Sequence, residues 1–183
     1  SGGLIISEYI EGSSNNKCLE LTNTSDSALD LSEFVLYTAY NATGYSGSTS
    51  LSGTLNAGAQ FVLCNSSAAP AFLNRADAVS GFGSALGFNG NDLTSLIELA
   101  TGDTIDRIGD PNNRGVNHTI IDNGVVHDIQ NVTLVRADSI RAGTAYWSRL
   151  RLQWHALSND SYDSLGSHTL KACSPTDLQI VPY

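Results

Sequence analysis

The stretch LIISEYIEGSSNNKCLEL, residues 4–21, contains two short segments in which apolar and polar residues alternate, separated by a polar loop. The alternating apolar residues are Leu4, Ile6, Ile10, Leu19 and Leu21. A period of two is typical of β-strands that bury one face. The stretch therefore predicts two strands, and Glu8 interrupts the apolar face of the first.

Similar short segments recur along the chain, with turn residues between them. They cover residues 29–37, 61–64, 96–99, 104–108, 133–136 and 150–154. Residues 101–103 (TGD) predict a hairpin turn, Asn123-Gly124 predicts a tight turn, and residues 70–78 predict a short helical turn. About nine short strands with no helix of ordinary length indicate an all-β fold, an antiparallel β-sandwich.

The composition excludes several classes of protein. Apolar residues make up 41% of the 183 residues and charged residues 15%, which is too hydrophobic for a disordered chain. A net charge of −9 argues against a general nucleic-acid binder, so nucleic acid is an improbable partner for this domain alone. No apolar run of about 18 residues occurs, so we expect no membrane span.

The chain has six N-x-S/T sequons among its 15 asparagines, about twice the number expected by chance. They predict glycosylation at Asn23, Asn41, Asn65, Asn117, Asn131 and Asn159. The alternative is a Ser- and Asn-rich bacterial surface protein without glycans. Both interpretations place the protein outside the cytosol, as a secreted or extracellular protein.

The chain has three cysteines, which are far apart and form no CxxC pair, so a zinc site is not expected. Outside the cytosol, three cysteines are expected to form one disulfide and leave one thiol. Cys18 and Cys64 each lie in a predicted strand and are the expected pair. Cys173 would then be free, or linked to another chain.

No combination of residues indicates catalysis, and we predict that the protein is not an enzyme. The histidines are His118, His127, His155 and His168. No GxSxG nucleophile motif accompanies them. We expect the side chain of His168, in the GSHT sequence, to bond the backbone at a strand end. Glu8 and Glu20 are expected on neighbouring strands, bonded to backbone N–H groups or facing solvent rather than acting as an acid/base pair.

Calcium is a weak possibility, and no other cofactor is expected. The candidate ligands are Asn91, Asp92 and Asp110, with Asn89, Asp103 and Asp106 nearby in the sequence. The spacing lacks the regular pattern of an EF-hand. The favoured interpretation of the FNGND sequence, residues 88–92, is a turn in which Asn and Gly adopt positive φ.

Aromatic residues gather in two parts of the sequence, Tyr37, Tyr40 and Tyr45 in one and Tyr146, Trp147 and Trp154 in the other. If exposed, they could stack on sugar rings. Packing in the core or at its rim is the commoner fate of tryptophan in a sandwich, and it is the favoured interpretation.

Several segments resemble the lamin tail domain family, as found in bacterial secreted proteins and other extracellular proteins. The similarity is carried by residues 4–21, 30–39 (DLSEFVLYTA), 51–64 (LSGTLNAGAQFVLC), 87–99 with 103–110, 133–140 (TLVRADSI) and 154–169. The resemblance implies an immunoglobulin-like β-sandwich and a non-catalytic role. Its cysteines, its sequons and its C-terminal extension distinguish this chain from the family pattern.

We therefore expect a lamin-tail-like domain over residues 1–170, followed by a tail or extra strand over 171–183. The expected function is a secreted structural or interaction domain, a candidate subunit of an extracellular matrix or filament. Its partners would be other protein chains, including copies of itself joined through the tail and Cys173, with glycans as a further possibility. The alternative is an accessory carbohydrate- or nucleic-acid-binding module of a larger secreted enzyme such as a nuclease.

Overall fold

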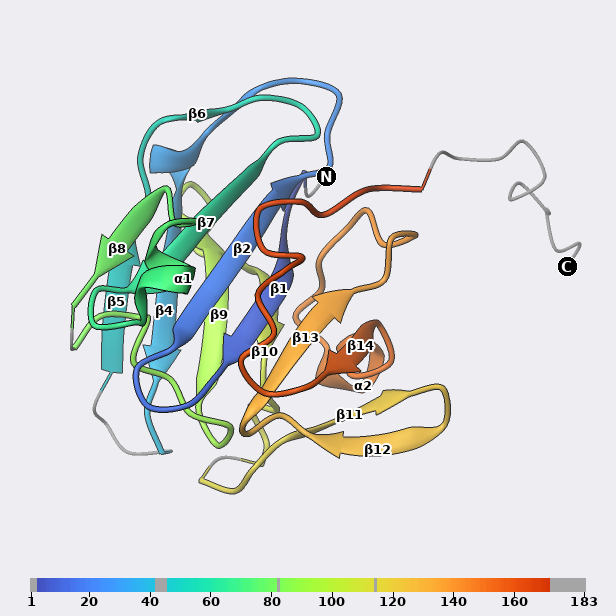
Figure 1. Cartoon of the computed structure of the whole chain (residues 1–183). Coiled ribbons are helices and arrows are strands. Elements are labelled where there is room, and N and C mark those ends of the chain that lie inside the picture. The colour runs from blue at the N-terminus through green and yellow to red at the C-terminus, as the bar shows by residue number, and fades with distance from the viewer. Residues whose placement is uncertain (1–2, 42–45, 82, 114, 172–183) are drawn as a thin grey trace, which may run out of the picture.

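The computed structural model describes residues 3–41, 46–81, 83–113 and 115–171. Two β-sheets face each other and enclose the hydrophobic core (Figure 1). This arrangement confirms the predicted all-β, immunoglobulin-like sandwich. None of the helices in these residues is long and apolar enough to cross a membrane.

The larger sheet has six strands and contains both halves of the opening stretch. In spatial order these are β14 (Trp154–Leu157), β13 (Val132–Arg136), β1 (Leu4–Glu11), β2 (Lys17–Asn23), β7 (Gln60–Asn65) and β8 (Ala78–Ser80). All neighbours are antiparallel except β7 and β8, which are parallel. The sheet therefore joins the first strands of the chain to the last ones.

The second sheet has four strands, in the order β10 (Thr104–Ile108), β9 (Leu93–Glu98), β4 (Phe34–Ala39) and β5 (Ser46–Ser50). Strands β9 and β10 form the hairpin predicted around residues 101–103. The remaining described strands form two small antiparallel pairs. Strand β3 (Leu29–Asp30) pairs with β6 (Thr54–Leu55), and β11 (Thr119–Asp122) pairs with β12 (Val125–Asp128).

The described residues contain fourteen strands rather than about nine. The difference comes largely from two- to four-residue strands, which are too short to show a period of two. Asn123 and Gly124 have φ values of 49° and 83° and form the tight turn between β11 and β12.

The helical segments are single turns: η1 (Leu31–Glu33), α1 (Pro70–Leu73) and α2 (Trp147–Leu150). The helical turn expected over residues 70–78 ends at Leu73, because Asp77 bonds the backbone of Val62 and Ala78 begins β8. Helix α2 was not predicted from the sequence, and the strand expected over residues 150–154 was wrong, because Leu150 belongs to α2 and β14 begins only at Trp154.

A second, smaller apolar cluster lies on the outer face of the large sheet. It consists of Ile10, Cys18, Val62, Cys64, Ala68, Phe72 and Leu165. A disulfide joins Cys18 to Cys64 in directly paired positions of β2 and β7. This is the pairing expected from the sequence, and Cys173 lies outside the described residues. Closing a loop with a sequence separation of 46 stabilises the fold by about 4 kcal/mol in the chain-entropy account.

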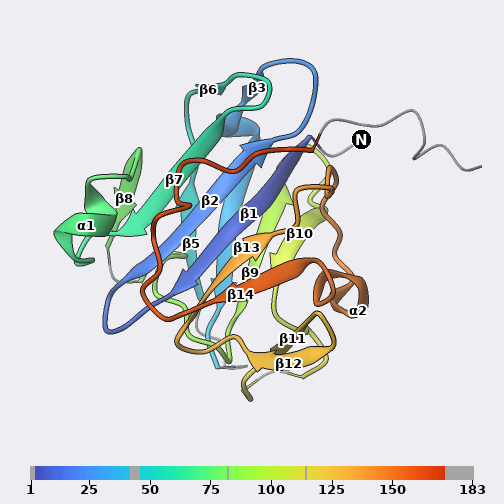
Figure 2. The ribbon, with the colours of Figure 1, turned by 45° about the vertical axis from the view of Figure 1, so that its right-hand side comes forward.

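After β14 the chain turns back and crosses the outer face of the large sheet, over β1 and β2, as Figures 1 and 2 both show. We call residues 158–171 the closing strap. Thr133 donates to the Ser161 carbonyl at 2.8 Å, and Gln60 donates to the His168 carbonyl at 2.9 Å. These bonds attach the strap to β13 and β7.

Candidate functional site

The candidate site begins with a β-bulge in the first strand. Ile6 pairs with Leu21 and Glu8 pairs with Glu20, so Ser7 is the extra residue. The extra residue shifts by one the alternation between core-facing and outward-facing side chains. Tyr9 therefore faces the core, while Glu8 faces outward. The bulge explains why Glu8 interrupts the apolar face in the sequence.

Polar residues on β1 and β2 then meet on the outer face, under the closing strap. Ser7, Glu8, Glu20 and Thr22 are all buried there. Ser7 donates to Glu20, Thr22 donates to Ser7, and the Gly166 N–H of the strap donates to Glu20 Oε2 at 2.7 Å. The Glu20 carboxylate therefore anchors the strap to the sheet.

Glu8 lies directly across from Glu20 but has a different environment. Burial, followed by the adjacent Glu20 carboxyl, raises the pKa of Glu8 from 4.5 to about 8. Burial also raises the pKa of Glu20, and its bonds from Ser7 and the strap oppose that rise. The expectation that these two carboxyls bond backbone N–H groups holds for Glu20, whereas neither side chain faces solvent.

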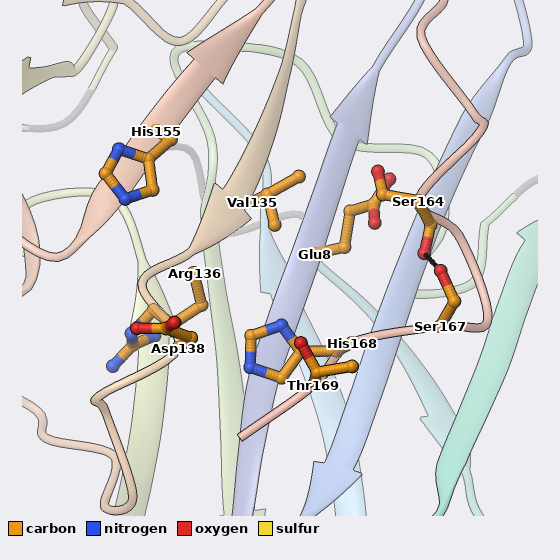
Figure 3. Close-up of a pocket in the computed structure, with 9 residues that line it drawn as sticks. All are labelled: Glu8, Val135, Arg136, Asp138, His155, Ser164, Ser167, His168 and Thr169. Carbon is orange, nitrogen blue, oxygen red and sulfur yellow. Dashed lines mark hydrogen bonds between the residues drawn. The ribbon is translucent and has the colours of Figure 1, made fainter. Parts of the chain in front are cut away.

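A cavity of about 340 Å³ opens beside Glu8, between β1, β13, β14 and the strap (Figure 3). It is lined by Glu8, Val135, Arg136, Asp138, His155, Ser164, Ser167, His168 and Thr169. Glu8 Oε1, Ser164 Oγ and His168 Nε2 are buried and have no hydrogen-bond partner among the described residues. The Ser164 hydroxyl lies beside the Glu8 carboxyl and opposes the rise of the Glu8 pKa, although no hydrogen bond of good geometry joins the two.

His168 corrects one prediction. Its backbone carbonyl, rather than its side chain, makes the bond that attaches the strap, to Gln60. Burial lowers the pKa of the His168 imidazole, so this side chain is neutral at pH 7. The sequence showed the GSHT motif but contained no signal that Ser164 and His168 would cover Glu8.

The residues considered as calcium ligands form hydrogen bonds within and between loops. Asp92 is buried and accepts from the backbone N–H groups of Asn41 and Asn89, both at 2.7 Å. Asn91 donates to the Asn41 side chain, and Asp110 accepts from the Asn112 N–H. In the described part of the chain, no three His, Cys, Asp or Glu residues form a group able to hold a metal ion.

Residues 88–92 do not adopt the positive φ values that were expected for Asn and Gly in this turn. Gly90 does not have a positive φ; a Cβ there would lie 2.6–2.8 Å from atoms of Gln130. The glycine is needed for close packing rather than for a left-handed turn.

Asp106, the other acidic residue of interest, lies between the two sheets. It forms an ion pair with Arg136 at 3.2 Å, and neither side chain is exposed. The Arg136 guanidinium also lies 4.7 Å from the centre of the Trp154 ring. Arg136 was not singled out from the sequence, where a lone arginine in a strand shows no sign of its buried partner. Asp103, in contrast, is exposed in the β9–β10 turn.

The aromatic residues divide between core and surface. Trp147, Trp154 and Tyr40 are buried, which confirms the favoured interpretation for the tryptophans. Tyr37 and Tyr146 are exposed, and Tyr45 lies outside the described residues. His118 accepts from the Asp110 N–H and packs against Trp147, and His155 pairs with Asp122.

The six sequons also divide into two groups. Asn23 and Asn65 are buried, and their side-chain amides donate to backbone carbonyls of Leu55 and Leu86, respectively. In this fold both side-chain nitrogens are therefore shielded from solvent and occupied by hydrogen bonds. The side chains of the other four sequon asparagines are exposed: Asn41, Asn117, Asn131 and Asn159.

Comparison with known families identifies residues 1–112 as a match to the Lamin Tail Domain model, which covers more than half of the chain. No curated protein matches the chain. The match ends before β13 and β14, yet β13 pairs with β1 inside the large sheet. The family comprises non-catalytic, immunoglobulin-like domains with interaction or structural roles. The chain belongs to the lamin tail domain family.

Proposed function

We propose that this domain is a secreted, non-catalytic structural or interaction domain that binds other protein chains. The observation that carries the proposal is the Cys18–Cys64 disulfide, which is fully buried in an apolar cluster of a lamin tail domain. Structural disulfides persist in oxidising compartments and are rare in the cytosol and nucleus. The disulfide thus supports an extracellular member of the family rather than a nuclear one.

The surface offers further support for a role in binding. Val125 and Val126 on β12 are 57% and 61% exposed. Contiguous exposed apolar side chains rimmed by polar ones mark interaction surfaces. The four exposed sequon asparagines are the proposed glycosylation sites, and glycans there would leave the disulfide cluster undisturbed. Residues 171–183 with Cys173 are the proposed self-association segment of a matrix or filament subunit, following a domain over 1–170.

The intact mass of protein from its native source tests this proposal. We expect glycan mass above 19.3 kDa, removed by glycosidase, and a multimer that reducing agent dissociates. A bare monomer without glycans would contradict the proposal and favour the alternative, an accessory ligand-binding module.

Deletion of residues 171–183 tests the tail separately. We expect the truncated protein to remain folded and to be monomeric by light scattering, because every strand of the two sheets in the described residues lies before residue 171. The matched control is Cys173→Ser, which removes only the interchain disulfide. Assembly that survives the deletion unchanged would rule out the tail as the contact.

A further inference from the structure

We propose that the cavity beside Glu8 binds a primary ammonium group, that of a lysine side chain from a partner protein chain. The inference rests on the proposed interaction role and specifies the chemistry of one contact. The Glu8 side chain is only 1% exposed, lines the cavity, and has an oxygen without a hydrogen-bond partner.

The first argument is the missing counter-ion. Buried carboxylates normally pair with a cation or receive several hydrogen bonds. Glu8 faces a second carboxyl, Glu20, and forms no ion pair with any residue that the structure describes. Arg75 acts on Glu8 only from a distance and instead bonds the Leu165 carbonyl. The cavity is therefore the place from which a cation can reach Glu8.

The second argument is the match of donors and acceptors. An ammonium group has three N–H donors and no acceptor. The unpartnered atoms on cavity-lining residues include a carboxyl oxygen, a hydroxyl oxygen and an imidazole nitrogen, on Glu8, Ser164 and His168. The fourth is Arg136 Nε, which belongs to the guanidinium that pairs with Asp106. Each of the first three can accept a hydrogen bond. These acceptors are on three different side chains, which suits the three donors of a compact ammonium group better than the planar guanidinium of arginine.

Protons must balance when the cation binds. At pH 7 the Glu8 carboxyl is largely protonated, so an entering ammonium displaces its proton to solvent and pairs with the carboxylate. The charged or titratable groups around Glu8 are Glu20 on β2, Arg136 on β13, Asp138 after β13, His155 on β14, His168 on the strap and Arg75 after α1. The charge of Arg136 is balanced by Asp106. Asp138 adds negative charge at the rim, which favours a cation further.

The test uses the full chain and Nα-acetyl-lysine methylamide as the probe, with binding followed by NMR shifts of Gly166 and the Glu8 carboxyl. Because Glu8 ionises near pH 8 and a lysine ammonium near 10.4, we expect the apparent Kd to fall about tenfold from pH 7 to pH 9. Nε-acetyl-lysine methylamide, which lacks the charge, should not bind. Glycinamide supplies an N-terminal amine instead, and binding of glycinamide alone would overturn the lysine assignment.

Glu8→Gln should abolish binding of the probe, and Glu33→Gln, at an exposed glutamate, should leave it unchanged. Gln has nearly the shape of a protonated Glu, so Glu8→Gln is expected to fold normally. His168→Gln provides a second variant, with an expected loss of about threefold to tenfold in affinity. Binding that Glu8→Gln does not alter would overturn the inference.

The probe experiment does not depend on assembly. Protein that multimerises through its tail but does not bind the probe would refute only the ammonium site. Protein that binds the probe but stays monomeric would refute self-assembly and leave the ammonium site supported.

Discussion

Asp106 and Glu8 are both buried carboxyl groups beside the bulge in β1, but their surroundings differ. Asp106 lies between the sheets, where it accepts from the Ile6 N–H at 2.9 Å and pairs with Arg136. Glu8 lies on the outer face, opposite Glu20 and next to a cavity. The same bulge serves both, because it leaves the Ile6 N–H and carbonyl available to Asp106 and Arg136.

The difference shows that burial alone does not assign a carboxyl group its role. Asp106 has its cation and backbone donors inside the fold, so its chemistry is complete and structural. The fold supplies no such cation to Glu8 within the described residues, so Glu8 stays protonated at neutral pH and can respond to pH and to ligands. Three substitutions test this contrast.

The largest effect is expected from Arg136→Ala. Removing the guanidinium leaves Asp106 buried without its cation, and the free energy of unfolding should fall by about 3–5 kcal/mol. Chemical denaturation measures this loss. Arg149→Ala, at an exposed arginine, is the control and should change stability little. Asp106→Asn in the Arg136→Ala background should restore part of the loss, because an amide needs no counter-ion; a further loss would contradict the ion-pair account.

Glu8 should produce an intermediate effect that depends on pH. Its pKa is about 8 in the fold and near 4.5 when unfolded, so its stabilising contribution is fully present below pH 4.5 and is lost as the pH rises to 8. Between pH 5 and pH 9 this group should cost the fold about 3–4 kcal/mol. Denaturation at both pH values, with Glu8→Gln for comparison, measures the difference. Equal pH dependence in the two proteins would show that Glu8 does not titrate as proposed.

Asp122 should show the smallest effect, because it is a carboxylate near solvent. It accepts from the Ala156 N–H at 3.1 Å and pairs with His155, whose side chain is 54% exposed. These bonds lower the pKa of Asp122, and Asp122→Asn should reduce stability by less than about 1 kcal/mol. Thermal unfolding at low and high salt measures this effect. A loss comparable to that of Arg136→Ala would mean that exposure does not separate these carboxyl groups.

Local patterns were sufficient to predict much of the fold. The hairpin of β9 and β10, the turn at Asn123-Gly124 and the strand positions of Cys18 and Cys64 depend on alternation and turn chemistry within a few residues. The short ladders and helix α2 could not be predicted in this way. Their hydrogen bonds depend on segments that meet only in the folded chain.

Only part of the candidate site could be predicted from the sequence. Glu8 and Glu20 were recognised as neighbours, but their burial depends on the closing strap, more than 130 residues away, whose Gly166 bonds Glu20 across a sequence separation of 146. Asn23 and Asn65 illustrate the same limit. A sequon has the same three-residue pattern whether its amide faces solvent or bonds the backbone of a distant strand.

The alternation of residues and the positions of turns can be found from the amino-acid order alone, and they are enough to predict a β-sandwich of the lamin tail domain family. Alternation assigns each side chain to one of two faces of a strand, but it does not reveal what covers that face. The pairing of Arg136 with Asp106, and the cover that the strap provides over Glu8, exist only in the folded chain. Desolvation and ion pairing depend on contacts between segments far apart in the chain, so no local pattern can reveal them.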